Sequence, residues 1–499
     1  MKVKDITSVT DLAAFCKEAG FVFPSGEIYG GLAGFWDYGP LGVELKNNIK
    51  KQWWDKFVRF RQDVVGMDGA IITHPRVWKA SGHVDGFNDL VTRCDKCKHQ
   101  FRADQLIEEV LKIPADGFSA KKIDLLIAKH KIGCQACKKG KLLPTHTYNL
   151  MFKTYIGPVQ SEDNVAYLRP ETAQLIYANF ANIIDTSRMK IPFGIAQVGK
   201  GFRNEISPRN FVFRDREFEQ MEIEYFVHPD KVEECPVLKE VEKTEFMFLS
   251  ATDQQKGNKP KKISIASLAK KSKLPWLCYW TGQIYNWFVK DLGLNPENLR
   301  VRAHLEEELA HYACMCYDIE YKYPFGWKEM IGVADRGDYD LSKHQKISGK
   351  RMAIFDEEQK KWVTPRVAAE PSLGVDRVFM AVILDAFTVQ KAKEEDRRLL
   401  KLKPALAPVQ VAVFPLMKKD RMPQRAKRIF DILKNKYICQ YDEAGSIGKR
   451  YRRMDEIGTP YCLTIDHQTI KDDTVTVRHR DTMKQKRVKI SELTTYLKF

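Results

Sequence analysis

A strictly alternating stretch in the middle of the chain predicts a β-strand with one polar and one apolar face. Its side chains divide into Phe218, Gln220, Glu222 and Glu224 on one side and Met221, Ile223 and Tyr225 on the other. The apolar side suits a protein core. An aromatic ring beside an amide and two carboxylates is suited to a nucleotide and an ammonium group. The alternative is a two-stranded ribbon with a solvated, charged outer face.

A second strand precedes this one and ends in the segment Gly201-Phe202-Arg203-Asn204-Glu205. The long turn that joins the two strands carries three arginines, Arg209, Arg214 and Arg216. Guanidinium groups form charge-assisted, often bidentate hydrogen bonds with phosphate. The hairpin therefore predicts a phosphate-binding site beside the polar face.

Another candidate site segment lies far downstream, from Glu370 to Arg377. We expect a turn that ends at Gly374, followed by a helix that starts near Arg377 and continues through the apolar run Val378 to Leu384. The first backbone N–H groups of a helix lack intrahelical partners, so together with the guanidinium they favour a polyphosphate.

The first ninety residues mix helix and strand. The apolar residues Leu45, Ile49, Trp53 and Phe57 recur at helical spacing, which predicts an amphipathic helix over residues 41–60. Residues 68–75 are expected to form a strand that ends at Pro75. Proline at that position is compatible with an edge strand.

Two Cys-x-x-Cys pairs predict a metal site in an insertion over residues 94–137. The four candidate ligands are Cys94, Cys97, Cys134 and Cys137. Four thiolates fill the coordination shell of Zn²⁺, so the metal would be structural rather than catalytic. The alternatives are reduced cysteines without metal, or a site in which His99 or His130 replaces a thiolate.

Three other segments bear on domain organisation. Helices expected at residues 105–111 and 121–129 fill the interval between the cysteine pairs. Residues 233–282 form a lysine-rich insertion, in which residues 255–262 are expected to be a flexible loop or, alternatively, an RNA contact. A charged, proline-containing linker over residues 391–408 predicts a domain boundary.

Beyond the linker, apolar strands alternate with helices, which predicts a small parallel α/β domain. The expected strands are 409–416, 438–441 and 461–465, and the expected helices are 426–435 and one that starts near 445. The second helix carries Lys449, Arg450, Tyr451, Arg452 and Arg453. Cations beside a stacking ring suit single-stranded RNA. The alternative is a solvated basic helix paired with Asp455 and Glu456.

Composition narrows the class of protein. The chain has 499 residues, enough for about three domains. Lys and Arg number 82 against 65 Asp and Glu, and the resulting net charge of +17 suits a polyanion such as RNA. No apolar run is long enough to predict a membrane span, and Met1 to Ile6 lack the apolar core of a signal peptide. Eleven scattered cysteines favour a reducing compartment, so we expect the cytoplasm.

The hairpin and the downstream strand–helix segment together resemble motifs 2 and 3 of class II aminoacyl-tRNA synthetases. The strings at residues 27–40, 169–174 and 334–341 resemble the single-chain, homodimeric glycyl-tRNA synthetase family more specifically. The resemblance covers nearly the whole chain. It implies an α/β multidomain (α+β) protein, with a class II catalytic domain on an antiparallel β-sheet flanked by helices and a C-terminal α/β anticodon-binding domain.

The resemblance also implies boundaries. The catalytic domain would comprise residues 1–93 and 138–395, with motif 1 near 43–75, motif 2 near 199–226 and motif 3 near 370–386. Motif 1 would build the dimer interface. Residues 94–137 would be the zinc-binding insertion, and 404–499 the anticodon-binding domain.

The implied reaction is activation of glycine with ATP, followed by transfer of glycine to tRNA(Gly). Arg203 and Arg377 would be catalytic, and Glu329 would bind the Mg²⁺ of MgATP. The implied ATP-binding residues are Arg203, Asn204, Glu205, Phe213, Arg214, Asp215, Arg216, Glu217, Phe218, Glu329, Met330, Gly374, Val375, Asp376 and Arg377. A catalytically inactive synthetase-like nucleic-acid-binding or polymerase accessory protein is the alternative.

Selecting glycine is a problem of exclusion, because the substrate has no side chain to bind. The implied glycine-binding residues are Arg102, Glu171, Phe218, Glu219, Gln220, Met221, Glu222, Glu370, Pro371, Ser372, Leu373 and Gly374. Arg102 has a structural salt bridge as its alternative, and Asp335 is either a supporting group of the site or a turn residue. Met330 would act through its backbone alone. Gly30 to Gly34 lack the context of a phosphate-binding loop and are expected to pack tightly beneath the site.

Overall fold

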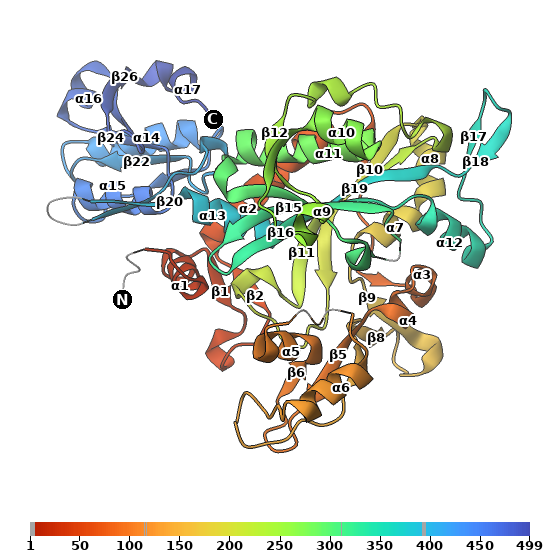
Figure 1. The fold of residues 1–499 in the computed structure, drawn as a ribbon. Coiled ribbons are helices and arrows are strands. Elements are labelled where there is room, and N and C mark those ends of the chain that lie inside the picture. Colours follow the sequence, from red (N-terminus) through yellow and green to blue (C-terminus); the bar gives the residue numbers. More distant parts are fainter. Residues whose placement is uncertain (1–4, 114, 116, 311, 392–395) are drawn as a thin grey trace.

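A nine-stranded β-sheet with helices around it forms the centre of the molecule (Figure 1). The computed structural model describes residues 5–391 and 396–499, apart from 114, 116 and 311. In spatial order the strands are β13 (Lys261–Ser264), β12 (Glu245–Leu249), β14 (Leu299–Ala303), β15 (Met315–Tyr323), β16 (Gly326–Asp335), β19 (Arg366–Gly374), β11 (Glu217–Val227), β10 (Phe193–Phe202) and β3 (Val64–Met67). Neighbours are antiparallel except at β12–β14 and β10–β3, which confirms the predicted fold class.

One face of the sheet is buried against three helices. These are α2 (Pro40–Trp54), α11 (Pro275–Asn286) and α13 (Val375–Ala386), whose apolar residues share one core with Met221, Ile223 and Tyr225 of β11. The alternation predicted for this strand is therefore confirmed.

The opposite face is covered at one end and open elsewhere. Helices α7 (Ala173–Ala178), α8 (Phe180–Ser187) and α12 (Tyr339–Ser348) pack on its covered end. The open part borders a cavity, which places polar strand residues where a ligand can reach them.

The predicted N-terminal helix is confirmed. It comprises α2 and a π-helical turn (Asp55–Arg59), and its four predicted apolar residues, Leu45, Ile49, Trp53 and Phe57, are at most 1% exposed. Helical spacing placed them on one face, and that face packs in the core.

The strand predicted over residues 68–75 is wrong. The sheet strand β3 lies earlier, and within the predicted range only β4 (Ile72–Thr73) is extended. Pro75 does not end a strand but starts α3 (Pro75–Ala80). Its fixed φ and missing N–H suit the first position of a helix, where no intrahelical partner is needed.

The turn predicted before Gly374 is also wrong, because residues 366–374 form β19. This strand pairs with both β11 and β16, and helix α13 begins directly after it at Val375. Pairing on both sides extends the chain up to Gly374, so Arg377 enters the site from the first turn of the helix.

The lysine-rich insertion over residues 233–282 is largely structured and belongs to the fold. It forms strands β12 and β13, α9 (Ala251–Gln255), α10 (Ile265–Ser272) and most of α11. Trp276 and Trp280 are buried in the main core, whereas Lys261 and Lys262 face solvent and pair with Asp253 and Glu245 at 2.8 and 2.6 Å. Of the loop predicted over residues 255–262, residues 256–260 do lie outside helix and strand, whereas Gln255 ends α9 and Lys261 and Lys262 belong to β13.

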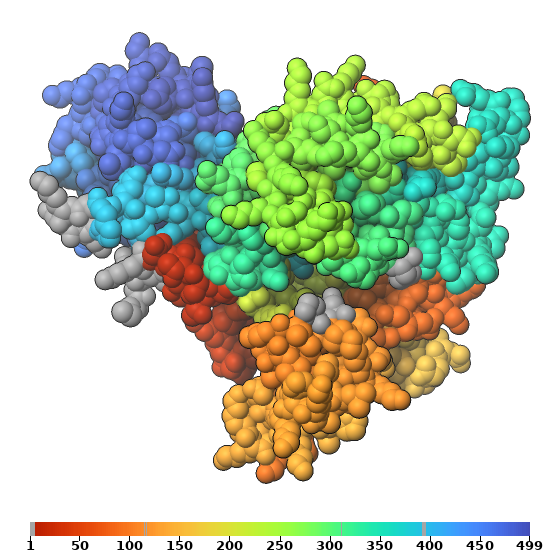
Figure 2. Space-filling model, viewed as in Figure 1, coloured from red at the N-terminus to blue at the C-terminus, as the bar shows by residue number. Residues whose placement is uncertain are grey.

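A separate lobe projects from the body and contains the cysteine pairs (orange in Figure 2). It is built from β5 (Asn88–Arg93), β6 (Gln100–Arg102), β7 (His146–Asn149), α5 (Ala103–Leu111) and α6 (Ala120–Lys129). Both helices predicted between the cysteine pairs are present.

The C-terminal unit is a five-stranded sheet with helices packed on it (blue in Figure 1). Its strands, in spatial order, are β23 (Cys439–Tyr441), β22 (Val411–Pro415), β24 (Tyr461–Ile465), β25 (Thr474–His479) and β26 (Gln485–Lys489), and its main helices are α14 (Met422–Leu433) and α15 (Ile447–Glu456). The expected parallel strands are present, but β25 and β26 are antiparallel additions that the prediction missed. The sheet is therefore mixed.

The predicted linker is largely structured. Strands β20 (Phe387–Gln390) and β21 (Arg397–Leu400) form a hairpin, and Leu399 and Leu400 are fully buried. Residues 392–395 of this segment, like Met1 to Lys4 of the predicted N-terminal segment, lie outside the described residues. Within the described ranges, no helix combines the length and apolar character needed to cross a membrane.

Candidate active site

A cavity of about 300 Å³ lies over the open face of the large sheet, between the strands and the loop that joins β10 to β11. The predicted site residues that line it are Glu171, Arg203, Glu205, Phe213, Arg214, Asp215, Phe218, Gln220, Glu222, Glu329, Glu370, Ser372, Gly374, Asp376 and Arg377. Residues up to 206 positions apart in sequence (from Glu171 to Arg377) thus meet around one space.

Strand register explains how the floor is assembled. Glu222 of β11 lies opposite Ser372 of β19, which lies opposite Gly332 of β16. Directly opposed residues of an antiparallel sheet share a face. A second row, two residues along, holds Glu370 opposite Ala334. The small residues Gly332 and Ala334 keep the middle of the floor free of bulky side chains.

Three buried carboxylates, Glu171, Glu222 and Glu370, gather around one part of the cavity. The hydroxyl groups of Thr172 and Ser372 both donate hydrogen bonds to Glu222. The Gln220 amide donates to the same carboxylate at 3.1 Å. These donors fix the orientation of Glu222, so its position does not depend on a ligand.

The charges around these carboxyl groups set their protonation. Burial raises the pKa of Glu370 to about 8, although Arg336 opposes the shift. Burial and then the negative charge of Glu171 raise the pKa of Glu222. Burial also acts against ionisation of Glu171, but His83, Arg336 and Arg203 outweigh it and lower the pKa of Glu171. A cation among the three groups would relieve their repulsion, so the cluster is suited to an ammonium group.

Arg336 anchors Glu370 and was not predicted as a site residue. It is 1% exposed, and its Nη1 lies 2.8 Å from Glu370 Oε1. Its Nε and Nη2 donate to the two oxygens of Asp340 at 2.8 and 2.9 Å, and the guanidinium lies 3.6 Å from the ring centroid of Tyr312. The sequence contains one signal, the i, i+4 spacing of Arg336 and Asp340, but that spacing does not reveal burial.

Arg203 lies between two aromatic rings. Its guanidinium is 5.2 Å from the ring centroid of Phe218 and 5.4 Å from that of Phe87, which was not predicted. Its Nε donates to the carbonyl of Pro170 at 3.0 Å. Gly201 faces Phe218, and a Cβ at that position would come within 2.8 Å of the ring. Glycine there leaves space for the ring on the cavity floor.

Arg377 reaches the cavity from the first turn of α13. Its Nη1 lies 3.0 Å from the carbonyl oxygen of Glu329 and 3.3 Å from the Glu329 carboxylate, and its guanidinium lies 4.5 Å from the ring centroid of Phe213. Arg214 also faces the cavity, and its Nη1 is buried without a hydrogen-bond partner among the described residues. A buried guanidinium nitrogen without a partner favours an anionic ligand.

Two lining aspartates are already bound by the protein. Asp376 accepts hydrogen bonds from Lys46 Nζ at 2.7 Å and from the backbone N–H of Glu219 at 2.8 Å. Asp215 accepts from the Trp36 indole at 3.0 Å, and burial raises its pKa to about 9. They support the walls of the cavity and offer little free charge to a ligand.

Strand alternation removes several predicted residues from the cavity. The side chains of Met221, Leu373 and Val375 belong to the core on the opposite face; that of Met330 does too, which is compatible with the predicted role through its backbone alone. Glu219 pairs with Lys46 and Lys50, and Pro371 lies opposite the core residue Val333. The prediction named continuous runs, but a pleated strand turns every second side chain away.

Four more predicted residues do not line the cavity. Asn204 donates to the Tyr148 hydroxyl at 2.6 Å, Arg216 donates to the carbonyls of Glu205 and Ala33 at 2.9 and 2.7 Å, and Glu217 pairs with Lys200. Arg102 forms ion pairs with Asp104 at 2.8 Å and Asp89 at 3.5 Å, which is its structural alternative. These four side chains form hydrogen bonds and ion pairs with other parts of the protein and do not face the ligand space.

Two smaller expectations can be compared with the structure. Asp335, the last residue of β16, accepts a hydrogen bond from the backbone N–H of Gly337 at 3.0 Å, as its turn alternative predicts, and also pairs with Arg366 at 3.0 Å. Of the two end residues of the segment expected to pack tightly, only Gly34 does so, because a Cβ there would lie 2.7 Å from Pro208. Gly30 and Gly31 are exposed.

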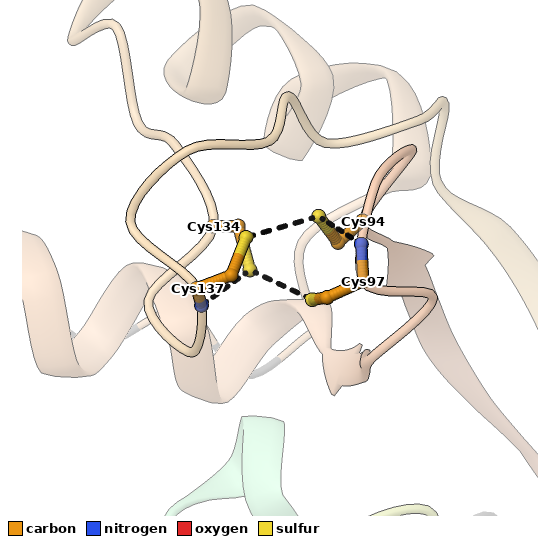
Figure 3. A group of neighbouring side chains, drawn as sticks. All are labelled: Cys94, Cys97, Cys134 and Cys137. Carbon is orange, nitrogen blue, oxygen red and sulfur yellow. Dashed lines mark hydrogen bonds between the residues drawn. The ribbon is translucent and has the colours of Figure 1, made fainter.

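The four cysteines of the lobe converge on one point (Figure 3). Sγ–Sγ distances are 3.7 Å for Cys94–Cys137 and 3.6 Å for Cys97–Cys134. A tetrahedral ion with Zn–S bonds of about 2.3 Å requires about 3.8 Å between sulfurs, so the cluster fits zinc. Backbone N–H groups, that of Lys139 foremost, lower the pKa of Cys137 to about 6 and favour its thiolate. Within the described residues neither His99 nor His130 belongs to this cluster.

The basic helix α15 exposes only part of its predicted RNA-binding set. Lys449, Arg452 and Arg453 are exposed, whereas Arg450 is 2% exposed and donates to the carbonyls of Pro415 at 2.6 Å and Leu416 at 3.3 Å. The prediction for Arg450 is therefore wrong, because its guanidinium satisfies carbonyl groups of its own domain. The half-buried ring of Tyr451 packs on Phe414.

The carboxylates expected to pair with this helix bind elsewhere. Asp455 bonds Arg397 at 2.7 Å and Arg478 at 2.9 Å, and Glu456 bonds Arg398 at 2.9 Å. Both carboxylates thus bind arginines outside α15, and Arg453 of the helix pairs with Asp442 at 2.6 Å.

Family models match two parts of the chain. Residues 152–275 match the tRNA synthetase class II core domain (G, H, P, S and T), and residues 410–499 match an anticodon binding domain. The first match includes the β10–β11 hairpin, and the second coincides with the five-stranded sheet unit.

Three relatives are similar over nearly the whole chain, and each is named glycine–tRNA ligase. That of Alkaliphilus oremlandii is 45% identical over 492 residues, covering 97% of each chain. That of Clostridium acetobutylicum is 46% identical over 503 residues, covering 99% of each. That of Geobacillus thermodenitrificans is 45% identical over 496 residues, covering 98% of this chain and 97% of the relative.

Solved structures share the fold at low sequence identity. A prolyl-tRNA synthetase from Cryptosporidium parvum superposes with a TM-score of 0.59 at 15% identity, covering 98% of this chain and 75% of that one. A threonyl-tRNA synthetase structure from Cryptosporidium parvum Iowa II gives a TM-score of 0.61 at 15% identity, covering 97% of both chains.

Proposed function

The chain belongs to the glycine–tRNA ligase family, and we propose that its cavity activates glycine with ATP to glycyl-adenylate and pyrophosphate before transferring glycine to the 3′ end of tRNA(Gly). One observation carries this proposal: a cluster of three buried carboxylates shares a single cavity with Arg203 and Arg377. An inactive synthetase-like nucleic-acid-binding protein would have no need for an ammonium site and phosphate-binding arginines in one place.

Glycine is selected by charge and by exclusion. We assign its ammonium group to Glu171, Glu222 and Glu370, whose mutual repulsion a cation relieves. Ser372 is held by its hydrogen bond to Glu222 and lies on the floor beside Gly332, so it cannot easily yield to a larger substrate. No proteinogenic amino acid is smaller than glycine, so exclusion alone suffices and an editing domain is unnecessary.

Adenylate formation requires alignment of two substrates and neutralisation of phosphate charge. A carboxylate oxygen of glycine attacks the α-phosphorus, the bond from that phosphorus to the bridging oxygen breaks, and pyrophosphate leaves. No protein nucleophile is needed. Arg203 is suited to hold the α-phosphate and the glycine carboxylate, Arg377 to hold the terminal phosphate, and Phe218 to stack on adenine.

The substrate complex is MgATP, as the class II core implies. Glu329 is the carboxylate that we propose for its Mg²⁺, because this side chain lines the cavity beside Arg377 and offers the oxygen ligands that magnesium prefers. Arg214, with an unpartnered buried nitrogen, is a further group for the phosphates.

The C-terminal unit, residues 404–499, is proposed to bind the anticodon. Lys449, Arg452 and Arg453 form an exposed basic surface on α15, and a net charge of +17 favours approach of RNA. Arg450 is left out of this set because it is buried. Deleting the unit is expected to preserve glycyl-adenylate formation and to raise the KM for tRNA.

We propose that two copies associate through the motif 1 region. Strand β3 is the last strand of the large sheet, so one of its edges has no partner strand among the described residues. Ile72, which follows β3 by five residues in the chain and lies on β4 of another sheet, is 54% exposed. Exposed apolar side chains beside an open edge favour an interface. Ile72→Glu should shift the sedimentation coefficient from that of a dimer to that of a monomer.

The lobe over residues 94–137 is proposed to hold one structural Zn²⁺. Its small apolar cluster around Leu106, Ile107 and Ile123 is separate from the main core, so a metal would contribute substantially to its stability. Protein purified without chelator should contain zinc that Cys137→Ser removes. A metal-free wild-type protein of full stability would contradict this assignment.

ATP–pyrophosphate exchange with glycine, alanine and serine tests the proposed activity. We expect exchange with glycine alone, and Arg203→Ala and Arg377→Ala should each reduce it by two or more decades, since one preorganised donor contributes about 2.7–4 kcal/mol. Lys200→Ala is the matched control, because this residue lies on the same hairpin but faces solvent. Normal exchange in either arginine variant would remove that residue from the site.

A further inference from the structure

Three metal-binding side chains that the proposed function does not use line the same cavity: His304, Cys316 and Asp318. An imidazole nitrogen, the thiol sulfur and a carboxylate oxygen of these residues lie within 4.8 Å of one another. Cys316 and Asp318 are two residues apart on β15 and so share a face. His304 follows β14, and its backbone N–H donates to the carbonyl of Cys316 at 3.0 Å. Sheet register therefore brings the three donors together.

The contacts within the group leave one nitrogen of His304 without a hydrogen-bond partner among the described residues. His304 Nε2 lies 2.9 Å from Asp318 Oδ1, and Cys316 Sγ lies 3.9 Å from the same oxygen. The other oxygen, Oδ2, accepts from Arg302 Nη2 at 2.9 Å. His304 Nδ1 is buried, and no described residue forms a hydrogen bond with it. The imidazole thus has one nitrogen beside Asp318 and one without a partner among the described residues.

We propose that His304, Cys316 and Asp318 form a binding site for one divalent transition-metal ion, with Zn²⁺ as the best match. Imidazole, thiolate and carboxylate are the three ligand types that proteins offer to zinc, whereas Mg²⁺ prefers oxygen ligands alone. Three protein ligands leave a coordination position open. Gly332 keeps that side free, because even a Cβ there would lie 3.7 Å from both Cys316 Sγ and Asp318 Oδ1.

The charge balance permits a cation. Arg302 is the positive group nearest to Asp318, but its Nη1 pairs with Glu308 at 2.8 Å, and Glu308 lines the cavity as well. The ion would lie on the floor two strands away from Ser372, a separation of about 10 Å at about 4.8 Å per strand. The site is thus distinct from the cysteine cluster of the lobe and from the carboxylates assigned to glycine, but it borders Glu329, whose Oε1 would lie 4.0 Å from the same Cβ position of Gly332.

Metal stoichiometry of the full-length chain tests the proposal. The wild-type protein, equilibrated with excess Zn²⁺ and freed of unbound metal, should hold two ions per chain. Cys316→Ser and His304→Gln should each hold one, and Cys137→Ser should also hold one. Cys314→Ser is the matched control, since this exposed cysteine lies two residues from Cys316 outside the cluster, and it should hold two.

The pattern of loss separates the two sites. Loss of one ion in Cys316→Ser with the lobe ion retained supports the new site, and so does an anomalous scattering peak bounded by the three residues in zinc-soaked crystals. A wild-type protein that holds only the ion removed by Cys137→Ser overturns the proposal. Retention of the second ion in both Cys316→Ser and His304→Gln overturns it too. None of these readouts requires ligase activity, so failure here is distinct from failure of the proposed function.

Discussion

Replacing Arg336 by methionine should both destabilise the catalytic region and weaken glycine binding. Arg336 is 1% exposed, and its guanidinium makes close hydrogen bonds to the buried carboxylates of Asp340 and Glu370. Removing one partner of a buried ion pair leaves the other charge without compensation and costs about 3–5 kcal/mol. Methionine fills similar volume, so the loss reflects charge and hydrogen bonding rather than a cavity. Urea unfolding should show this decrease in the free energy of unfolding.

The effect on glycine follows from Glu370, which Arg336 holds in place. Losing one well-placed charged hydrogen bond costs about 1.5–3 kcal/mol, which raises the KM for glycine about ten- to a hundredfold. ATP–pyrophosphate exchange at varied glycine concentration measures this change. Arg351→Met is the control, because this exposed arginine stacks on Trp362 at 4.0 Å and should change stability by about 0.5 kcal/mol or less. A wild-type glycine KM together with unchanged unfolding in Arg336→Met would refute the reasoning.

Three further predictions concern other parts of the structure. Because burial raises the pKa of Glu370 to about 8, the KM for glycine should fall as pH rises toward 8, and Glu370→Gln should flatten this profile. The raised pKa also means that the folded state holds a proton on Glu370 that the unfolded state releases. The contribution of Glu370 to the free energy of unfolding should therefore decrease as pH rises from about 4.5 to 8. Gly201→Ala should raise the KM for ATP more than that for glycine, since the new Cβ displaces the Phe218 ring; equal effects on both substrates would argue against ring displacement. Arg450→Ala should lower the unfolding temperature of the C-terminal unit because three backbone carbonyls lose their donor. Lys449→Ala, which changes an exposed side chain of the same helix, should leave that temperature unchanged and raise the KM for tRNA; the opposite pattern would reverse the assigned roles.

Local spacing in the sequence determined much of the architecture. The period-2 pattern of residues 217–226 predicted which side chains of β11 face the core and which face the cavity, and the helical spacing of Leu45, Ile49, Trp53 and Phe57 predicted α2. The Cys-x-x-Cys pairs predicted a cluster that the structure forms. In each case the information lies within a few neighbouring residues, because strand and helix geometry fix where side chains at short spacing point.

Tertiary structure alone decided the composition of the site. Leu373 lies within a predicted glycine-binding run but points into the core, because β19 with its two partner strands stands where the sequence predicted a turn. Arg450 was predicted to be an exposed cation, but in the fold its guanidinium donates a hydrogen bond to a backbone carbonyl of its own domain. Whether a polar side chain is buried depends on which residues pack against it in the fold. These residues are distant in the sequence, so the local pattern does not identify them.

The most consequential groups join residues that are far apart in the chain. Arg336 reaches Glu370 across 34 positions, and His304 meets Asp318 across 14. Such encounters are fixed by the register of β14, β15, β16 and β19, which is a cooperative property of the whole sheet. The sequence therefore specified the elements and their faces, while register and packing decided which charges and donors came to share one cavity.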